Sequence, residues 1–129
     1  MTGIDNRLEQ KIGFDRIRRI ISDKCSTTYA AGRTATETFS AKPSQIRKRL
    51  LLTDEMRLIM MFEDGFPSSG FIDCIDFLKP LENSSSAIDI ISLRKLKTML
   101  DTLRRVTAFF EDVKDGVYPY LKRMSASIL

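Results

Sequence analysis

The sequence contains no histidine and no tryptophan, and it has only two cysteines and six glycines among 129 residues. Without histidine, the chain lacks the side chain that most often acts as a general base near neutral pH and most often binds transition metals. The sequence contains no phosphate-binding loop motif, neither GxxxxGK(S/T) nor GxGxxG. Most enzyme classes, including nucleotide hydrolases, are therefore disfavoured for this segment.

The two cysteines, Cys25 and Cys74, could form at most one disulfide, and neither has a partner at a zinc-binding spacing. We expect both to be reduced, half-buried thiols. The residues after Met1 lack the apolar run of a signal peptide, and no window approaches the roughly 18 apolar residues of a membrane span. We therefore expect a cytoplasmic protein with no membrane partner.

Composition is typical of a soluble globular protein. Hydrophobic residues make up 43% and charged residues 29% of the chain, which is enough apolar material for one compact core. The 21 basic and 17 acidic residues give a formal net charge of +4. This charge is compatible with an acidic partner but falls short of that of a dedicated polycationic binder.

Three helices are predicted in the first half of the chain. Apolar residues at steps of three and four predict a helix over about 14–25, and Gly13 precedes it as N-cap. A weaker helix is predicted within 29–39, after a Ser-Thr-Thr run that offers candidate caps. Pro43 then leads into a long helix over about 45–64.

The helix over 45–64 carries apolar residues on more than one side. Two stripes can be drawn, and they comprise Ile46, Leu50, Met60 and Met61 on one side and Leu51, Leu58 and Phe62 on another. Leu52 and Ile59 lie on neither stripe. Because a surface helix needs only one apolar stripe, we expect this helix either to occupy the centre of a bundle or to pack against a partner outside these residues. We favour some contribution from outside.

The second half of the chain is predicted to contain two loops and two further helices. Glycine, proline and serine predict irregular loops near 65–72 and 83–91, with a short helical turn between them that ends near Pro80. A clean amphipathic pattern predicts a long helix over 93–113. Another helix is expected after Pro119.

The start of the helix over 93–113 is expected to follow an extended segment. Ile88, Ile90 and Ile91 are β-branched and favour extended backbone, and Ser92 would then serve as N-cap. Taken together, these patterns predict an all-α fold, a bundle of about four to five helices in a single module over residues 1–129.

No catalytic, cofactor-binding or metal-binding residue is predicted in this chain. Carboxylate pairs such as Asp73 and Asp76 could share a helix face, but isolated acidic pairs are usually solvated or cap helices. Only lysine is present as a base to activate a serine, so nucleophilic catalysis is not expected. An isolated enzyme is the least favoured of the hypotheses.

Basic residues are the candidate contacts to nucleic acid. Arg47, Lys48 and Arg49 surround the start of the helix over 45–64. On the helix over 93–113 one side carries Arg94, Lys97, Arg104 and Arg105, with Asp101 among them. Such a face is usually the solvated side of a helix, and the alternative is a surface that tracks phosphates. No aromatic residues interleave with the cations, so stacking on single strands is not expected.

The sequence ends within a helical pattern. Residues Ser125–Leu129 contain no C-cap glycine and no charged tail. We therefore expect the 129 residues to be the front part of a longer protein.

Six short sequence segments along most of the chain share a resemblance to one protein family. They are Lys11–Ile17, Gly32-Arg33, Lys42–Ser44, Thr53–Glu55, Phe71–Asp73 and Leu78–Leu81. In their order they resemble the N-terminal region of the bacterial MutS paralogue class, MutS-like ATPases that lack a mismatch-recognition domain and often carry a C-terminal Smr domain. Lys11–Ile17 is similar to that family's Leu-Glu-Phe-Asp-Lys-Ile signature, and Thr53–Glu55 to its Thr-x-Glu.

The resemblance implies a non-catalytic core or lever module that contacts the remainder of its own chain. Such proteins bind ATP with Mg²⁺ through a Walker motif far downstream, form homodimers at full length, and act on branched DNA or ribosomes in DNA repair, recombination control or ribosome rescue. Some also have nuclease activity in the additional domain. The alternative is a self-contained helical module that binds nucleic acid or a protein partner through its basic helix face.

Overall fold

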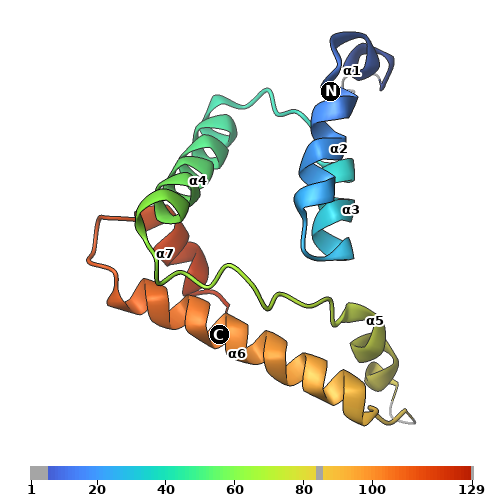
Figure 1. Cartoon of the computed structure of the whole chain (residues 1–129). Coiled ribbons are helices and arrows are strands. Elements are labelled where there is room, and N and C mark those ends of the chain that lie inside the picture. The colour runs from blue at the N-terminus through green and yellow to red at the C-terminus, as the bar shows by residue number, and fades with distance from the viewer. Residues whose placement is uncertain (1–5, 84–85, 129) are drawn as a thin grey trace. The chain divides into compact units, whose positions relative to one another are not determined.

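A computed structural model describes residues 6–83 and 86–128 of the chain (Figure 1). All regular structure in these residues is helical, with seven α-helices and one short 3-10 helix, which confirms the all-α prediction. Contacts between residues divide the chain into two compact units, Met1–Ala41 and Lys42–Leu129.

The first unit contains three helices: α1 (Asn6–Ile12), α2 (Phe14–Lys24) and α3 (Thr28–Thr36). The predicted helix over 14–25 is confirmed as α2, and Gly13 before it has φ of 76°, a left-handed conformation that glycine adopts without strain. The weaker helix is confirmed as α3, with Thr27 as its N-cap. α1 went unpredicted because seven residues are too few for helical periodicity to stand out.

Arg18 of α2 joins all three helices of the first unit. Its guanidinium donates hydrogen bonds of 2.8 and 3.0 Å to the Glu9 carboxylate on α1 and one of 2.7 Å to the carbonyl of Thr34 on α3. The guanidinium carbon also lies 5.1 Å from the ring centre of Phe14, which contacts Phe39. Hydrogen bonding within this pair lowers the pKa of Glu9 and raises the pKa of Arg18.

The first unit has little core of its own. None of its described side chains, over residues 7–41, is buried. Ile17, Ile20 and Ile21 of α2 are about half exposed, with Ile20 the most exposed at 60%. Taken alone, a unit of this size buries too little apolar surface to offset the loss of chain entropy.

The second unit contains the longest helices. Its elements are α4 (Pro43–Phe62), α5 (Ile75–Leu78), the 3-10 helix η1 (Lys79–Glu82), α6 (Ile90–Asp112) and α7 (Pro119–Ser125). The predicted long helices over 45–64 and 93–113 are confirmed as α4 and α6, with ends that differ by three residues or fewer. The predicted short helical turn and the helix after Pro119 are also confirmed.

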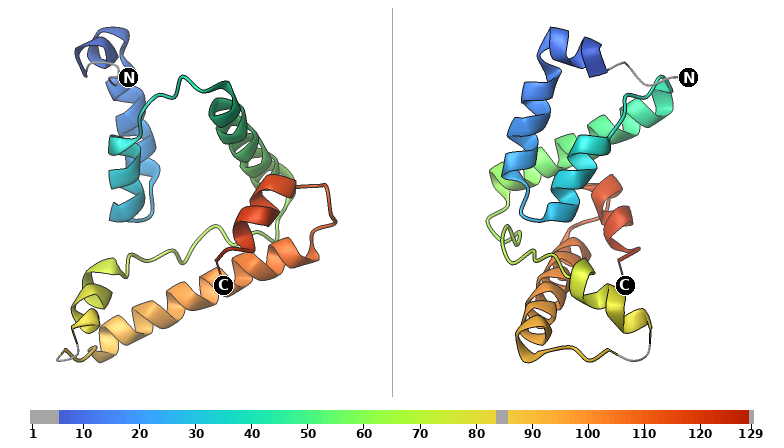
Figure 2. Two further views of the ribbon diagram at one scale, coloured as in Figure 1. Left: turned by 180° about the vertical axis from the view of Figure 1, so that it is seen from behind. Right: turned by 90° about the vertical axis from the view of Figure 1, so that its right-hand side faces the viewer.

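The core of the second unit lies where α7 meets α4 and α6. Both views in Figure 2 show α7 beside these two helices. The buried apolar residues of this core are Ile59, Val106, Phe110, Tyr118 and Leu121. Phe66, from the loop after α4, closes one side of the core through edge-to-face contacts with Phe109 and Phe110.

The loop between α4 and α5 is attached to α6 through Thr102 and Gly70. The Thr102 hydroxyl is fully buried and lies 3.0 Å from the carbonyl oxygen of Gly70 and 2.9 Å from that of Thr98, both within hydrogen-bonding distance. Gly70 has φ of 88°, and a Cβ atom there would lie 2.5 Å from the Thr102 hydroxyl oxygen. Only glycine fits both the backbone conformation and the close approach.

The start of α6 corrects one expectation from the sequence. Ile90 and Ile91 are not extended but form the first turn of the helix, and the N-cap is Asp89 rather than Ser92. The Asp89 carboxylate accepts hydrogen bonds from the Ser92 amide at 2.9 Å and the Ser92 hydroxyl at 2.7 Å, and these hydrogen bonds lower the pKa of Asp89. The carboxylate cap outweighs the preference of isoleucine for extended backbone.

The rest of the second unit covers only one side of α4. Glu55 and Ile59 are its buried residues. The side chains of the first predicted stripe are each between 40 and 65% exposed, and they are Ile46, Leu50, Met60 and Met61. Within the second unit, α4 therefore does not lie at the centre of a bundle. The other alternative, a partner outside these residues, stays a prediction.

Candidate functional site

A side chain from α4 holds the N-terminus of α7. Glu55 Oε1 accepts a hydrogen bond of 3.1 Å from the amide of Tyr120, and Oε2 accepts one of 2.8 Å from the amide of Leu121. An α-helix leaves such amides without partners in its first turn. Glu55 is only 8% exposed, and its charge complements the positive end of the helix dipole. α4 thus fixes where α7 begins.

Two further side chains, Tyr118 and Lys122, hold the segment around the start of α7. The Tyr118 hydroxyl donates a hydrogen bond of 2.9 Å to Glu63, at the end of α4. Burial, together with this hydrogen bond, raises the pKa of Tyr118. The Lys122 ammonium donates to the carbonyl of Val113 and to Asp115, and the latter bond lowers the pKa of Asp115. These contacts connect α7 to the end of α4 and to the segment after α6.

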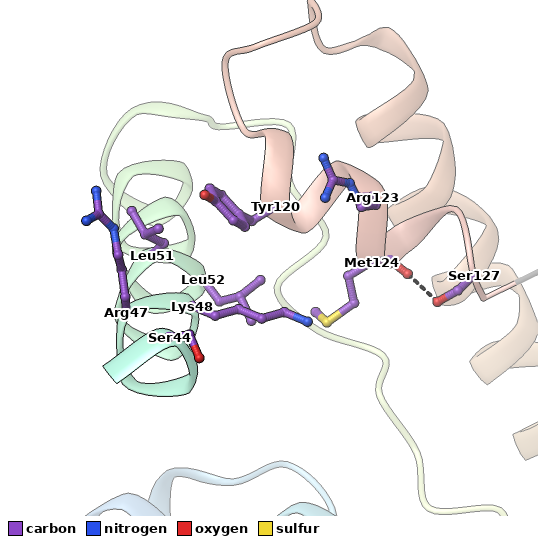
Figure 3. Close-up of a pocket in the computed structure, with 9 residues that line it drawn as sticks. All are labelled: Ser44, Arg47, Lys48, Leu51, Leu52, Tyr120, Arg123, Met124 and Ser127. Atoms are coloured by element: carbon purple, nitrogen blue, oxygen red, sulfur yellow. Dashed lines mark hydrogen bonds between the residues drawn. The ribbon is translucent and has the colours of Figure 1, made fainter. Parts of the chain in front are cut away.

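A groove of about 540 Å³ lies between α4 and α7 (Figure 3). Its lining residues are Ser44, Arg47, Lys48, Leu51 and Leu52 from α4, and Tyr120, Arg123, Met124 and Ser127 from α7 and the residues after it. Figure 3 shows the Lys48 side chain reaching across the groove toward Met124, with Leu52 beside it. The groove therefore combines an apolar floor with basic side chains.

Helical spacing explains how these residues come together. Residues four positions apart stand on the same side of a helix. On α4 this spacing places Arg47 next to Leu51 and Lys48 next to Leu52. On α7 the same spacing joins an aromatic residue to a methionine. Each helix thus presents polar and apolar groups on one face, and the contact between α4 and α7 brings the two faces opposite each other.

The groove is positively charged. Arg47, Lys48 and Arg123 line it, and no acidic side chain does so among the residues that the structure describes. Within the same residues, none of these three cations forms an ion pair. A concave surface lined by charges of one sign concentrates its potential. The arrangement suits a ligand that carries both negative charge and an apolar surface.

The four predicted nucleic-acid contacts lie elsewhere, on α6. They are exposed, and helical geometry places them in one arc of the helix: Arg94, Lys97, Arg104 and Arg105. Asp101 and Asp112 lie in the same arc. The Arg105 guanidinium also donates a long hydrogen bond of 3.4 Å to Thr102. The structure keeps the four residues on one helix face, but it mixes them with carboxylates and places none of them in the groove.

Sequence reasoning did not identify the groove. It treated Arg47 and Lys48 only as part of a basic run at a helix start, and it did not consider Arg123. One signal was present, since a cation precedes a leucine by four residues at two successive positions. That signal marks a mixed helix face, but only the tertiary contact shows that α7 lies opposite it.

The structure places the two cysteines as separate free thiols. Cys25 is half-buried and Cys74 is buried, and burial raises the pKa of the Cys74 thiol. Residues 6–83 and 86–128 contain no group of three or more cysteine, aspartate and glutamate side chains placed to bind a metal ion.

No helix in the described part of the chain is both long enough and apolar enough to cross a lipid bilayer. No protein-family model matches the chain, and no curated protein or solved structure shows significant similarity to it. The resemblance to MutS-like ATPases therefore stays a prediction.

Proposed function

We propose that the chain is a non-catalytic helical module of a MutS-like ATPase, in which it acts as a structural lever. The observation that carries this proposal is the apolar face of α4 that the rest of the second unit leaves uncovered. Leu50, Met60 and Met61 on that face are between 59 and 65% exposed, although a helix of a self-sufficient domain keeps its apolar residues toward the core. Such a face is expected where a helix packs against another part of a larger protein.

The connections within the second unit support a role in transmitting movement. Glu55 and Glu63 attach α4 to α7 and to the residue before it, and Thr102 attaches the intervening loop to α6. Elements joined by several hydrogen bonds and by a shared apolar core move together as one body. The segment Thr53–Glu55, which resembles the family's Thr-x-Glu, supplies the glutamate that caps α7.

Catalysis and cofactor binding belong to other parts of the protein under this proposal. ATP and Mg²⁺ bind downstream, the remainder of the same chain covers α4, and the full-length protein forms a homodimer. Branched DNA or a stalled ribosome is the target of the whole assembly, in DNA repair, recombination control or ribosome rescue. The chain itself contributes no reacting group.

The native gene product tests the proposal. The protein is purified from its source through an N-terminal tag, and its intact mass, ATP binding and ATP hydrolysis are measured. We expect a mass well above the 14.8 kDa of this chain, together with ATP hydrolysis. A native product near 14.8 kDa, or a larger product without ATP binding, overturns the proposal.

A matched pair of variants examines the face of α4 in that native protein. Leu50→Glu places a charge on this face of α4, whereas Thr98→Glu adds the same charge at an exposed polar position on α6. If the face is covered in the full protein, Leu50→Glu lowers thermal stability and ATPase activity more than Thr98→Glu does. Equal behaviour of the two variants contradicts coverage of this face.

A second candidate function is direct binding of nucleic acid through α6. The exposed cations Arg94, Lys97, Arg104 and Arg105 favour it, whereas Asp101 and Asp112 in the same arc oppose it. Titration of the chain against labelled branched DNA at low and high salt provides the test. Tight binding that falls steeply with salt and is lost in Lys97→Glu supports this function, and absence of binding at low salt overturns it.

A further inference from the structure

We propose that the groove between α4 and α7 binds an acidic, amphipathic helical segment of a partner protein. The inference goes beyond the proposed function, because the groove would hold such a segment whether or not the chain belongs to a MutS-like ATPase. It rests on the shape of the groove, on its apolar floor and on the charge around it.

The length and floor of the groove fit a short helix. Its α4 side runs from Ser44 to Leu52, about 12 Å at 1.5 Å per residue, which matches roughly two turns of a bound helix. The floor is apolar and consists of Leu51, Leu52 and Met124. A helix docked in a groove anchors through side chains three and four positions apart. The unbranched Met124 side chain can adapt to different anchors.

The charge of the groove selects an acidic occupant. Arg47, Lys48 and Arg123 line it, and none of them forms an ion pair within the described part of the chain. Glutamate or aspartate residues beside the apolar anchors of a bound helix would pair with these cations. Complementary charge of this kind favours the correct partner and speeds association more than it deepens affinity.

The same observations argue against nucleic acid as the occupant. A phosphate backbone would pair with the cations but would leave the leucine and methionine floor without an apolar partner. Binding of bases commonly uses successive aromatic platforms, and Tyr120 is the only aromatic residue that lines the groove in the described chain. An amphipathic helix satisfies both the charges and the floor.

Fluorescence anisotropy with designed peptides tests the inference on the full chain. The probe is a labelled helical peptide of about 16 residues, with leucine at steps of three and four and glutamate on both flanks. A control peptide has lysine in place of each glutamate. We expect saturable binding of the glutamate peptide that weakens with salt, and binding of the lysine peptide weaker by at least about tenfold.

Variants of the chain locate the binding. Arg47→Glu and Arg123→Glu each weaken binding of the glutamate peptide by about tenfold. Met124→Ala, at a side chain that is 52% exposed, weakens it as well, by a smaller factor. Lys97→Glu on α6 makes the same change of charge outside the groove and leaves binding nearly unchanged. Circular dichroism verifies that each variant keeps its helical content.

Three results overturn the inference. One is absence of saturable binding by the glutamate peptide at low salt. Another is an equal effect of Lys97→Glu and the two groove variants, which would indicate attraction by net charge alone. The third is binding of branched DNA that is lost in Arg47→Glu and Arg123→Glu, which would make the groove a phosphate site. None of these measurements depends on the mass or ATPase activity of the native gene product, so each proposal can fail independently.

Discussion

The Glu55 carboxylate on α4 accepts a hydrogen bond of 2.8 Å from the amide of Leu121 on α7, although 66 positions separate the two residues in the sequence. Helix caps usually come from the residue just before the helix. Here the residue before α7 is Tyr118, whose side chain makes no capping hydrogen bond. A short helix that begins without a local cap thus depends on a distant carboxylate.

Replacing Glu55 is therefore expected to destabilise the second unit. Glu55→Ala leaves the amides of Tyr120 and Leu121 without their acceptor, which costs about 1 to 3 kcal/mol. Asp54→Ala is the matched control, because Asp54 is exposed and only pairs with Arg57 in the next helical turn, so that it costs less than about 1 kcal/mol. Urea unfolding followed by circular dichroism measures both. Equal losses for the two variants would contradict the capping role.

The core is expected to respond strongly to loss of Ile59. This side chain has no exposed surface and lies among the core residues of α6 and α7. Ile59→Ala removes buried methyl groups and leaves a cavity, for an expected loss of about 2 to 5 kcal/mol. Met60→Ala, at a neighbouring position that is 59% exposed, is expected to change stability by less than about 1 kcal/mol. If the denaturant midpoints of Ile59→Ala and Met60→Ala shift equally, Ile59 does not lie in the core.

Gly70 is expected to tolerate no side chain. Gly70→Ala forces a left-handed backbone on alanine and brings its Cβ against the Thr102 hydroxyl, and the expected loss is about 1 to 3 kcal/mol. The control is Gly65→Ala, where an added Cβ meets no atom within 4 Å. Because Thr102→Ala removes the clashing oxygen, the double variant with Gly70→Ala should lose less than the sum of the two single variants. Thermal melts of all four variants measure this coupling, and simple additivity would contradict the contact.

The N-cap of α6 is expected to make stability depend on pH in the acid range. Hydrogen bonds from the Ser92 hydroxyl and amide lower the pKa of Asp89. A carboxyl whose pKa is lower in the folded state stabilises the fold above its unfolded pKa of about 3.9, and this stabilisation is lost as pH falls through the folded pKa.

Carbon-13 NMR titration of the Asp89 carboxyl measures the effect directly. We expect its pKa to lie below the ordinary value in the parent chain and to move back toward that value in Ser92→Ala, which removes the side-chain donor. Ser86→Ala, at an exposed serine before the helix, serves as control. If the pKa of Asp89 is the same in Ser92→Ala and Ser86→Ala, the Ser92 hydroxyl is not the main cause of the lowered pKa.

The sequence predicted the helices of this fold wherever local signals agree. α2 begins at Phe14 as expected, because apolar periodicity and Gly13 both indicate that start. α4 begins at Pro43, where a proline with fixed φ suits the first turn of a helix. α1 was missed because its seven residues span barely two turns.

Tertiary relationships could not be predicted in the same way. Ile90 and Ile91 read as extended from their own preferences, and only the Asp89 cap shows that the helix begins with them. Nothing near Glu55 in the sequence indicates that its carboxylate contacts α7. The groove likewise exists only once α7 has been placed, and the placement comes from contacts between residues far apart in the chain.

The spacing between Glu55 on α4 and Glu63, the C-cap of α4, restricts where residues can be inserted into or deleted from this unit. Both carboxylates contact the chain around the start of α7, so the number of residues between them sets the angle at which the two anchors leave the helix. One inserted residue would turn one anchor by about 100° around the helix axis and break the match. The segment between α6 and α7 is not helical, and surface connections of that kind accommodate insertions more readily. Insertions and deletions should therefore be tolerated between α6 and α7 but not in the last two turns of α4.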